Sequence, residues 1–453
     1  MSPTLILTFM MATAAVQRKV AVVGGGITGA CVASTLARLS SVNNNDDTII
    51  HVFDQGRSGV GGRTSHRRVS SSTTDDDLRW DHGCQFFRAD TPQFQEVIKE
   101  WMDKKIAVEW EGNFVGEPGG ADFFGLPTQP PFYVGVGGIK SISHNLLHET
   151  SERIHVFEGQ RVAGMTHDDS DKTWKLFGTS GEAAYHDSDE SVAKAVSPEL
   201  IGEGYDAVIM TDISSSFSSW HRASAGVPED FADRVRTKAG ARVPLFTCMI
   251  AFETNMPVDI SAATLNDPSL WFAARSNAKP GLENCLTQDC WTLVSTPEYA
   301  MQAIEETPMQ DPKTGEFIPQ PPDYLTSVPG PELEAAFRRI VKEGRLGKVE
   351  GDLPKTAYLN AQRWGSALPA HRHLDESSPT RKIISGVAYD SGRASLAPTT
   401  KQGASADNFV ADEGRMLFQA GDMVSNYSPG FEGAALSGID AAHHIYELLN
   451  RSP

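Results

Sequence analysis

Three glycines near the start of the chain follow directly on an apolar run. Gly24, Gly26 and Gly29 form the pattern G-x-G-x-x-G after the segment Val20 to Val23, and a segment of small residues comes next. In a dinucleotide-binding turn the first glycine permits the tight turn, the second lets a pyrophosphate approach, and the third lets the helix pack closely. The helix N-terminus adds free N–H groups and a partial positive charge. A tight turn without a ligand has the same pattern, so a second strand ending in an acid must decide.

Such an acid is present. The run "IIHVFD" reads as a strand with Asp54 at its carboxyl end. A carboxylate there accepts hydrogen bonds from both ribose hydroxyls of an adenosine and disfavours a 2′-phosphate, so NADP is expected to bind poorly. The interval from Gly29 exceeds the usual spacing of about 20 residues, and the loop "SSVNNNDDT" accounts for the excess. The alternative is a solvated strand end.

A second glycine-rich loop, "GRSGVGGRTSHRR", follows this acid. Gly61 and Gly62 keep the loop thin, and the guanidinium of Arg63 suits phosphate oxygens. We therefore expect this loop to return to the same dinucleotide. We interpret Arg67 and Arg68 as surface residues.

The next segment, "WDHGCQFFRADTPQF", mixes polar and aromatic residues. Gln85 and Phe86 are candidates for lining a flat aromatic ligand. His82 is the one catalytic candidate, because imidazole is the usual acid or base near neutral pH. A histidine satisfied within a turn is the alternative.

The C-terminal region offers a second glycine–acid pair. An apolar strand, Met416 to Ala420, precedes Gly421 and Asp422, and a helix rich in small residues begins near Glu432 and Gly433. Asp422 can bind a polyol hydroxyl, and the helix N-terminus can stabilise negative charge such as that of a reduced flavin. A helix of small residues that merely packs closely is the alternative.

Periodicity and turn residues predict the elements that must position these groups. A helix from Thr91 to Trp101 is expected, with Thr91 as N-cap and Pro92 at its first position. The other expectations are a helix over 28–40, neighbouring strands within 154–178, a buried strand in "YDAVIMTDIS", an antiparallel sheet over 243–297, an exposed insertion over 179–204 and a long surface loop over 300–331.

Composition limits the class of protein. A chain of 453 residues with a formal net charge of −18 is expected to form two domains and to be repelled by nucleic acids and anionic membranes. Five cysteines without C-x-x-C spacing indicate reduced thiols and no metal site; they are Cys31, Cys84, Cys248, Cys285 and Cys290.

Taken together, these segments resemble the renalase-type family of FAD-dependent oxidoreductases, relatives of the amine oxidases. The resemblance is carried by "VAVVGGGITGA", "VFD", "GGRTSHRR", "WDHGCQFFRADTPQF" and "AGDMVSNYSPGFEGAALSGIDAA". It implies an α/β fold with a Rossmann-like, p-hydroxybenzoate-hydroxylase-like FAD-binding domain and an interleaved antiparallel-sheet substrate domain. Cys84 and Thr28 stand where small residues are usual in the family.

The family also implies residue roles. FAD is the expected cofactor, with Val162 beside the adenine and with Asp422 on the ribityl chain or phosphate. The implied FAD-binding residues are Gly24, Gly26, Gly29, Asp54, Gly61, Gly62, Arg63, Val162, Gly421, Asp422, Glu432 and Gly433. The candidates for the substrate pocket are Gln85, Phe86, Trp271, Arg275, Arg363 and Trp364.

The implied activity is oxidation of dihydronicotinamide compounds, particularly isomers of NAD(P)H. Hydride would pass to flavin N5 and the electrons to O2, giving H2O2. The alternatives are an amine oxidase or desaturase, and an FAD-binding protein without turnover. Covalent attachment of the flavin through Cys84 or Cys31 has no supporting motif. A small-molecule substrate and O2 are the expected partners, with no protein partner predicted.

Domain boundaries and location complete the expectations. Residues 17–90, 132–215 and 405–450 are assigned to the FAD-binding domain, and 91–131 and 216–404 to the substrate domain. Residues 1–16 are placed outside the fold. No segment reaches a membrane-spanning length, so a cytoplasmic protein is expected. If the N-terminal apolar segment is a targeting peptide, the protein is secreted or organellar.

Overall fold

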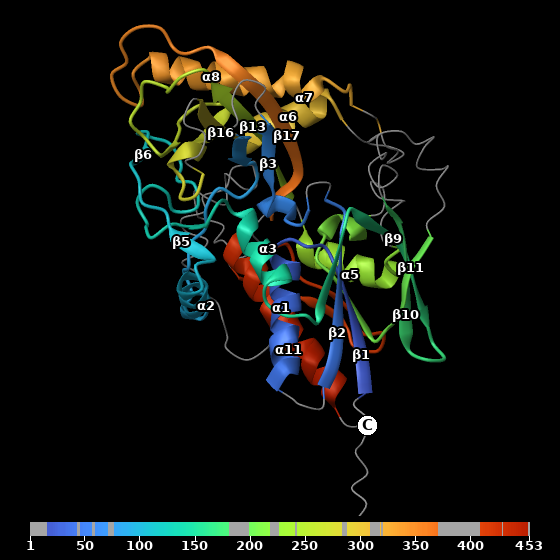
Figure 1. The fold of residues 1–453 in the computed structure, drawn as a ribbon. Coiled ribbons are helices and arrows are strands. Elements are labelled where there is room, and N and C mark those ends of the chain that lie inside the picture. Colours follow the sequence, from blue (N-terminus) through green and yellow to red (C-terminus); the bar gives the residue numbers. More distant parts are fainter. Residues whose placement is uncertain are drawn as a thin grey trace, which may run out of the picture.

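Two large sheets lie toward opposite ends of the molecule, with a cavity between them (Figure 1). The computed structural model describes residues 16–42, 46–56, 59–70, 77–180, 199–217, 226–240, 242–282, 288–308, 318, 320–369, 408–427 and 429–451. Of residues 1–16, which we place outside the fold, 1–15 are not among them, and Val16 is instead the first residue of the first strand. Within the described part, no helix has both the length and the apolar character needed to cross a membrane.

The first sheet has the strand order β18-β19-β12-β1-β2-β8 and is parallel except for β18. Val20 and Val22 are fully buried, as expected for a central parallel strand covered on both faces. The chain runs from β1 to β2 on one side and later to β12 on the other, so the strand order reverses at β1. Its strands are β1 (Val16–Val23), β2 (Asp46–Asp54), β8 (Ile154–Glu158), β12 (Ala207–Met210), β18 (Val410–Asp412) and β19 (Leu417–Gln419).

Helices cover one face of this sheet, and a three-stranded sheet covers the other (Figure 1). The strand predictions around β1 and β2 and the small-residue helix are confirmed. The covering helices are α1 (Ile27–Val42), α3 (Lys140–His148) and α11 (Phe431–Asn450), and the second layer holds β9 (Gln160–Asp168), β10 (Thr173–Ser180), β11 (Glu199–Tyr205), the short helix η4 (Ile213–Ser216) and α5 (Glu229–Ala239).

The three-stranded sheet differs from the prediction for 179–204. Glu199–Tyr205 pairs with β10 as β11, so this part of the proposed insertion is a strand. The strand was not predicted because its sequence, ELIGEGY, contains acidic residues and glycines, which have low strand propensity. Residues 181–198 lie outside the described part.

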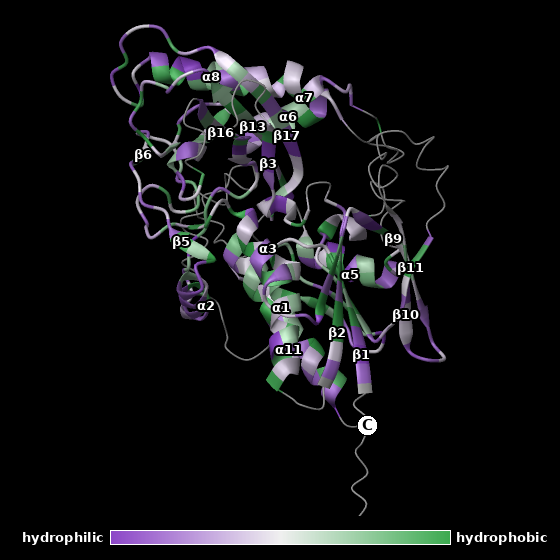
Figure 2. Ribbon diagram, viewed as in Figure 1, coloured by the Kyte–Doolittle hydropathy of each residue, from purple (hydrophilic) through white to green (hydrophobic). Residues whose placement is uncertain are grey.

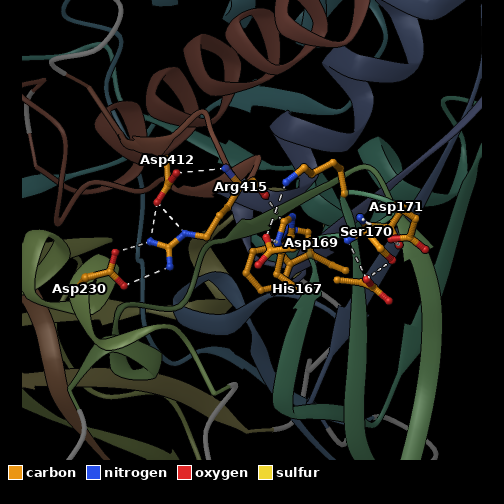
Figure 3. Close-up of polar contacts among 11 residues, drawn as sticks. His167, Asp169, Ser170, Asp171, Asp230, Asp412 and Arg415 are labelled. Atoms are coloured by element: carbon orange, nitrogen blue, oxygen red, sulfur yellow. Dashed lines mark hydrogen bonds and ion pairs between the residues drawn. The ribbon is translucent and has the colours of Figure 1, made fainter.

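Arg415 joins this layer to the first sheet (Figure 3). Its guanidinium forms ion pairs with Asp412 in β18 and Asp230 in α5. Its carbonyl oxygen accepts a hydrogen bond from Trp174 Nε1 at 2.6 Å. The turn between β9 and β10 lies beside Arg415 and is stabilised by hydrogen bonds between nearby residues, such as the one between His167 and Asp169. Three separate chain segments are thereby fixed together.

The second sheet has the order β17-β13-β16-β15-β14-β6, and β13 to β17 pair antiparallel as expected for 243–297. Figure 1 shows α6, α7 and α8 over its outer face. The elements are β6 (Phe114–Gly116), β13 (Arg242–Phe252), β14 (Ala262–Thr264), β15 (Leu270–Arg275), η5 (Ser276–Ala278), β16 (Asp289–Ser295), α6 (Pro297–Glu306), α7 (Tyr324–Ser327), α8 (Pro329–Lys342) and β17 (Thr356–Pro369).

The prediction of a long surface loop over 300–331 was wrong. Most of α6, all of α7 and the start of α8 lie within it. Pro297 and Pro329 stand at the first positions of α6 and α8, where proline is favoured because no N–H is needed. We interpreted a high proline content as a loop when part of it starts helices.

Smaller elements connect the two sheets. The prediction for α2 is confirmed, and Thr91 Oγ1 accepts from Phe94 N at 3.2 Å. The exposed face of α2 is hydrophilic, while it buries Phe94, Ile98 and Trp101 (Figure 2). The division into two domains stays a prediction. These elements are η1 (Gly62–Thr64), β3 (His66–Ser70), β4 (Asp77–Asp81), α2 (Pro92–Asp103), β5 (Ala107–Glu109) and β7 (Tyr133–Gly135).

Close packing of α11 against α1 generates the first prediction. A Cβ atom on Gly438 would lie 2.5 Å from the carbonyl oxygen of Thr28. Gly438→Ala should therefore lower the free energy of unfolding by about 1–3 kcal/mol through overpacking, despite the better helix propensity of alanine. Chemical denaturation measures this effect. Gly414→Ala is the control, because its nearest contact would be an ordinary 3.6 Å; equal stability of both variants would contradict the packing argument.

Candidate cofactor and substrate cavity

A cavity of about 1580 Å³ runs from the carboxyl ends of β1, β2 and β12 to the inner face of β17. Ligand pockets for small molecules are typically about 300–1,000 Å³. The cavity therefore has room for an extended ligand and a second molecule beside it. It lies where the strand order of the first sheet reverses, the usual place for a ligand in an open α/β sheet.

The glycine turn lies at one end of this cavity. Gly24 has a φ of +109°, and a Cβ atom on it would lie 2.3 Å from Thr211 Oγ1. A Cβ on Gly29 would lie 1.9 Å from the carbonyl oxygen of Gly24, which explains the close approach of α1. Gly24 and Gly26 line the cavity, whereas Gly29 does not. The motif thus leaves bare backbone facing the space at the start of α1.

Asp54 closes the same end. Its Oδ2 accepts from Gly25 N at 2.6 Å, and its Oδ1 accepts from Gly56 N at 2.7 Å. Burial raises the pKa of Asp54, although the N–H groups of Gly56 and Gly25 oppose the shift. Each carboxylate oxygen has a second lone pair, and Asp54 lines the cavity. The arrangement can accept two further hydrogen bonds from a diol.

Arg63 and Asp422 meet across the cavity. Arg63 donates to both carboxylate oxygens of Asp422 and, from Nη1, to Ala367 O at 2.9 Å. Burial alone would lower the pKa of Arg63. The negative charge of Asp422 and its hydrogen bonds have the larger effect, so the pKa is raised. Three of the five guanidinium N–H groups are used in these bonds. Two remain for a ligand, while Asp422, expected to contact the cofactor itself, chiefly orients Arg63.

The late glycine–acid loop is held by its own hydrogen bonds. Gly421 N donates to Ser437 Oγ at 2.8 Å, and Gly430 N donates to Asp422 Oδ2 at 3.1 Å. Gly421 and Asp422 line the cavity. Asp422 therefore also fixes the residue before α11.

Glu432 differs from its predicted role. Its two carboxylate oxygens accept from the main-chain N–H groups of Asp90 and Thr91 at 2.8 and 2.9 Å. Burial raises its pKa, with those N–H groups opposing. Glu432 borders the cavity but anchors the start of α2 to α11, and Gly433 beside it is outside the lining.

Gly61, Gly62 and Val162 all line the cavity. Gly61 and Gly62 lie opposite the glycine turn, and a Cβ on Gly26 would lie 3.3 Å from Gly61 O. Val162 is a buried residue of β9 on the side of Asp54. Their contacts to a cofactor stay a prediction.

His82 lines the cavity beside Trp364, with ring centroids 5.4 Å apart. Its Nε2 lies 3.0 Å from Ser65 Oγ, whose hydrogen goes to Gly62 O at 2.6 Å. Burial, and next the charge of Arg67, lowers the pKa of His82 to about 4. The imidazole is therefore neutral near pH 7, which does not suit a general acid at that pH.

The substrate candidates divide into two groups. Gln85, Phe86, Arg363 and Trp364 line the cavity. The Gln85 amide is occupied by the protein, since it accepts from Lys279 Nζ at 3.2 Å and donates to the carbonyl oxygens of residues 81 and 83. Nη1 of Arg363 donates a hydrogen bond at 3.4 Å to the carbonyl oxygen of Thr307, the residue that follows α6.

Trp271 and Arg275 lie outside the lining, so their assignment to the pocket is corrected. Trp271 packs on Phe123 and donates to Asp122 O at 3.2 Å. Arg275 pairs with Asp289 at 3.0 Å. Trp271 lies at a register irregularity of β15, and Arg275 is the last residue of that strand, so strand periodicity alone did not predict where either side chain lies.

Sequence reasoning missed three features of the cavity. Arg67, interpreted as a surface residue, lines it, as does Arg242 at the start of β13. Lys279 and Asp81 form a buried ion pair at 3.0 Å behind Gln85. Alternation along β3 gives no signal for Arg67, because its neighbour His66 also lines the cavity. All three features depend on contacts between distant segments.

The cysteines do not favour covalent chemistry. Burial raises the pKa of Cys84 to about 12 and also raises that of Cys31. Thiolate is the reactive form. Among the described residues no three His, Cys, Asp or Glu side chains are grouped to hold a metal ion.

Comparison with known proteins identifies the first part of the chain. Residues 22–101 match the NAD(P)-binding Rossmann-like domain family. This part of the chain has a Rossmann-like fold. The α/β fold class is thereby confirmed. No curated protein sequence matches the chain significantly.

Most of the chain can be superposed on solved structures of other enzymes. A reduced UDP-galactopyranose mutase superposes with a TM-score of 0.53 at 11% identity, covering 95% of this chain and 94% of that one. Putrescine oxidase bound to putrescine gives a TM-score of 0.48 at 11% identity, covering 95% and 99%. The flavin-dependent halogenase CmlS gives 0.38 at 14% identity, covering 77% and 50%. The likeness to the mutase shows a shared fold over nearly the full length.

The pKa of His82 generates the second prediction. Because its folded-state pKa of about 4 lies below the ordinary 6.5, the unfolded chain takes up this proton first. The contribution of His82 to stability is complete above pH 6.5 and is lost as the pH falls toward 4. In urea titrations across this window, His82→Gln should lose less stability than the wild type. Parallel losses in the two proteins would show that His82 is not buried in its neutral form.

Proposed function

We propose that the protein is an FAD-dependent oxidoreductase. The observation that carries this proposal is the single cavity that joins Gly24 and Asp54 to Arg63 and Asp422. The exposed backbone of the glycine turn and the N-terminus of α1 lie at one end of the cavity. The Arg63 guanidinium, paired with Asp422, lies further along it. An extended dinucleotide requires this order of groups for its ribose, pyrophosphate and distal chain.

The residues present fit FAD. Asp54 has two lone pairs for the adenosine ribose, and Arg63 has two N–H groups for phosphate oxygens. A side chain at Gly26 would fill the cradle between the two glycine loops. Val162 and the β9 backbone would border the adenine, and Gly421 would let the distal chain pass close to the main chain.

We further propose that the enzyme is a renalase-type oxidase of dihydronicotinamide compounds. The motif "WDHGCQFFRADTPQF" supports this choice, and the space beyond Arg63 suits a second planar molecule. Bound FAD supplies the hydride acceptor and returns the electron pair to O2, so that dihydronicotinamide, O2 and one proton give the oxidised nicotinamide and H2O2.

The chain itself would orient the reductant and exclude water. Trp364 presents its ring to the cavity while its Nε1 donates to His82 O at 3.0 Å and to Thr247 Oγ1 at 3.2 Å. Thr247 Oγ1 donates to the same carbonyl at 2.8 Å. The ring is therefore held in one orientation, as a stacking surface for a planar ring must be. Neutral His82 would position rather than transfer a proton.

Asp54 provides the third prediction. Asp54→Ala should weaken FAD binding about tenfold or more, since it removes the acceptors for two hydroxyl groups. The flavin retained after gel filtration and the Kd for reconstitution measure this loss. Asp47→Ala is the matched control, because Asp47 lies at the opposite end of β2 and pairs with Arg153 near the surface. Equal retention in both variants would contradict the assigned ribose contact.

A reductant screen provides the fourth prediction. The purified protein should be yellow, should bleach rapidly under anaerobic conditions with isomeric dihydronicotinamides, and should form H2O2 on exposure to air. Bleaching by amines alone would favour an amine oxidase. A flavin that no reductant bleaches would favour a binding protein without turnover. A colourless folded protein that does not take up FAD would overturn the proposal, and a yellow pellet after acid precipitation would show covalent attachment.

A further inference from the structure

Three arginines on the cavity wall, Arg67, Arg242 and Arg363, form no ion pair with any residue of the described chain, and Arg363 donates to the carbonyl oxygen of Thr307. Arg63 pairs with Asp422, and Arg88 pairs with Asp90. The full chain carries 58 acidic against 40 basic residues. In so acidic a protein, guanidinium groups that form no ion pair are a specific feature of this wall.

Arg67 and Arg242 lie on either side of Trp364. Arg242 Nη1 donates to Ser366 Oγ at 2.9 Å, two residues beyond Trp364 on β17. Arg67 lies opposite Trp80 in the β3–β4 pair, and the Trp80 ring stacks at 5.1 Å on that of Tyr358, six residues before Trp364 on β17. A molecule stacked on Trp364 would therefore meet a guanidinium toward each end of the strand.

Both side chains are only partly buried, and that of Arg242 is held in place. The guanidinium of Arg242 lies 3.7 Å from the centroid of the Phe217 ring. Burial lowers the pKa of Arg242, with the charge of Asp212 opposing, and Asp212 itself is bonded to the main chain and hydroxyl of Ser214. Partial burial of a cation without a counter-ion is unfavourable, and an anionic ligand would remove that penalty.

We propose that Arg67 and Arg242 bind phosphate groups of a nucleotide substrate whose reducing ring stacks on Trp364. The proposal rests on the proposed function and names the class of reductant as a phosphate-bearing dihydronicotinamide nucleotide. A planar guanidinium fork matches phosphate oxygens. The same wall would repel a protonated amine, so it opposes the amine-oxidase alternative.

Kinetics with two reductants test the inference. One reductant is an isomeric dihydronicotinamide adenine dinucleotide, and the other is an N-alkyl dihydronicotinamide, which has the ring and no phosphate. Arg67→Gln and Arg242→Gln should each raise the KM for the dinucleotide about tenfold, with little change in kcat. Neither should alter the KM for the N-alkyl compound. Arg79→Gln is the control, because Arg79 lies on the neighbouring strand β4 and outside the cavity lining.

A binding measurement separates this inference from the proposed function. Calorimetry of NAD⁺ binding to the oxidised, FAD-loaded enzyme needs no turnover, and its affinity should fall with added salt and in both variants. If no dihydronicotinamide bleaches the flavin but this binding behaves as expected, the proposed function is wrong and the phosphate site stands. Unchanged dinucleotide KM and NAD⁺ affinity in either variant would overturn the phosphate site. Equal losses for both reductants would also overturn it, since they indicate a general distortion.

Discussion

The ion pair between Arg63 and Asp422 holds the cavity together. The Asp422 side chain is fully buried, whereas 35% of the Arg63 side chain is exposed, so removing Arg63 would leave a buried carboxylate uncompensated, at a cost that solvent screening of the pair reduces. The pair joins the loop after β2 to the loop before α11, and Arg63 also reaches Ala367 at the end of β17. The first sheet, the second sheet and the C-terminal helix therefore meet at one guanidinium.

A second ion pair, buried deeper in the molecule, also joins distant segments of the chain. Lys279 and Asp81 are both almost fully buried, and Asp81 Oδ1 also accepts from Ile139 N at 3.0 Å. Lys279 follows β15, Asp81 ends β4, and Ile139 precedes α3. This pair fixes the segment around Gln85, which forms part of the cavity wall. As in the first pair, each charge compensates the other in a region with little access to water.

Local rules predicted the parts of the fold that local interactions determine. The glycine turn, the strand ending at Asp54 and the Thr91 cap depend on neighbours within a few residues, and each was found from spacing alone. Arg275 and Glu432 show where this reasoning ends, because their partners, Asp289 and the N–H groups before α2, depend on how distant segments pack. Arg67 and Arg275 are the same residue type on strands, and only the tertiary structure shows that Arg67 lines the cavity whereas Arg275 pairs with Asp289.

The glycine turn and the segment from Gly421 to α11 lie on two walls of the same cavity but are far apart in the sequence. The glycine turn is made first, but Gly421 and α11 come from the last part of the chain, and α11 packs directly on α1. During synthesis, a growing polypeptide that lacks its final segment would expose the apolar side of α1 and present only an open half-cradle. Under the proposed function, a nucleotide would therefore gain its full set of contacts only after α11 has docked on α1, and a variant that lacks α11 would lose its ligand together with this wall of the cavity.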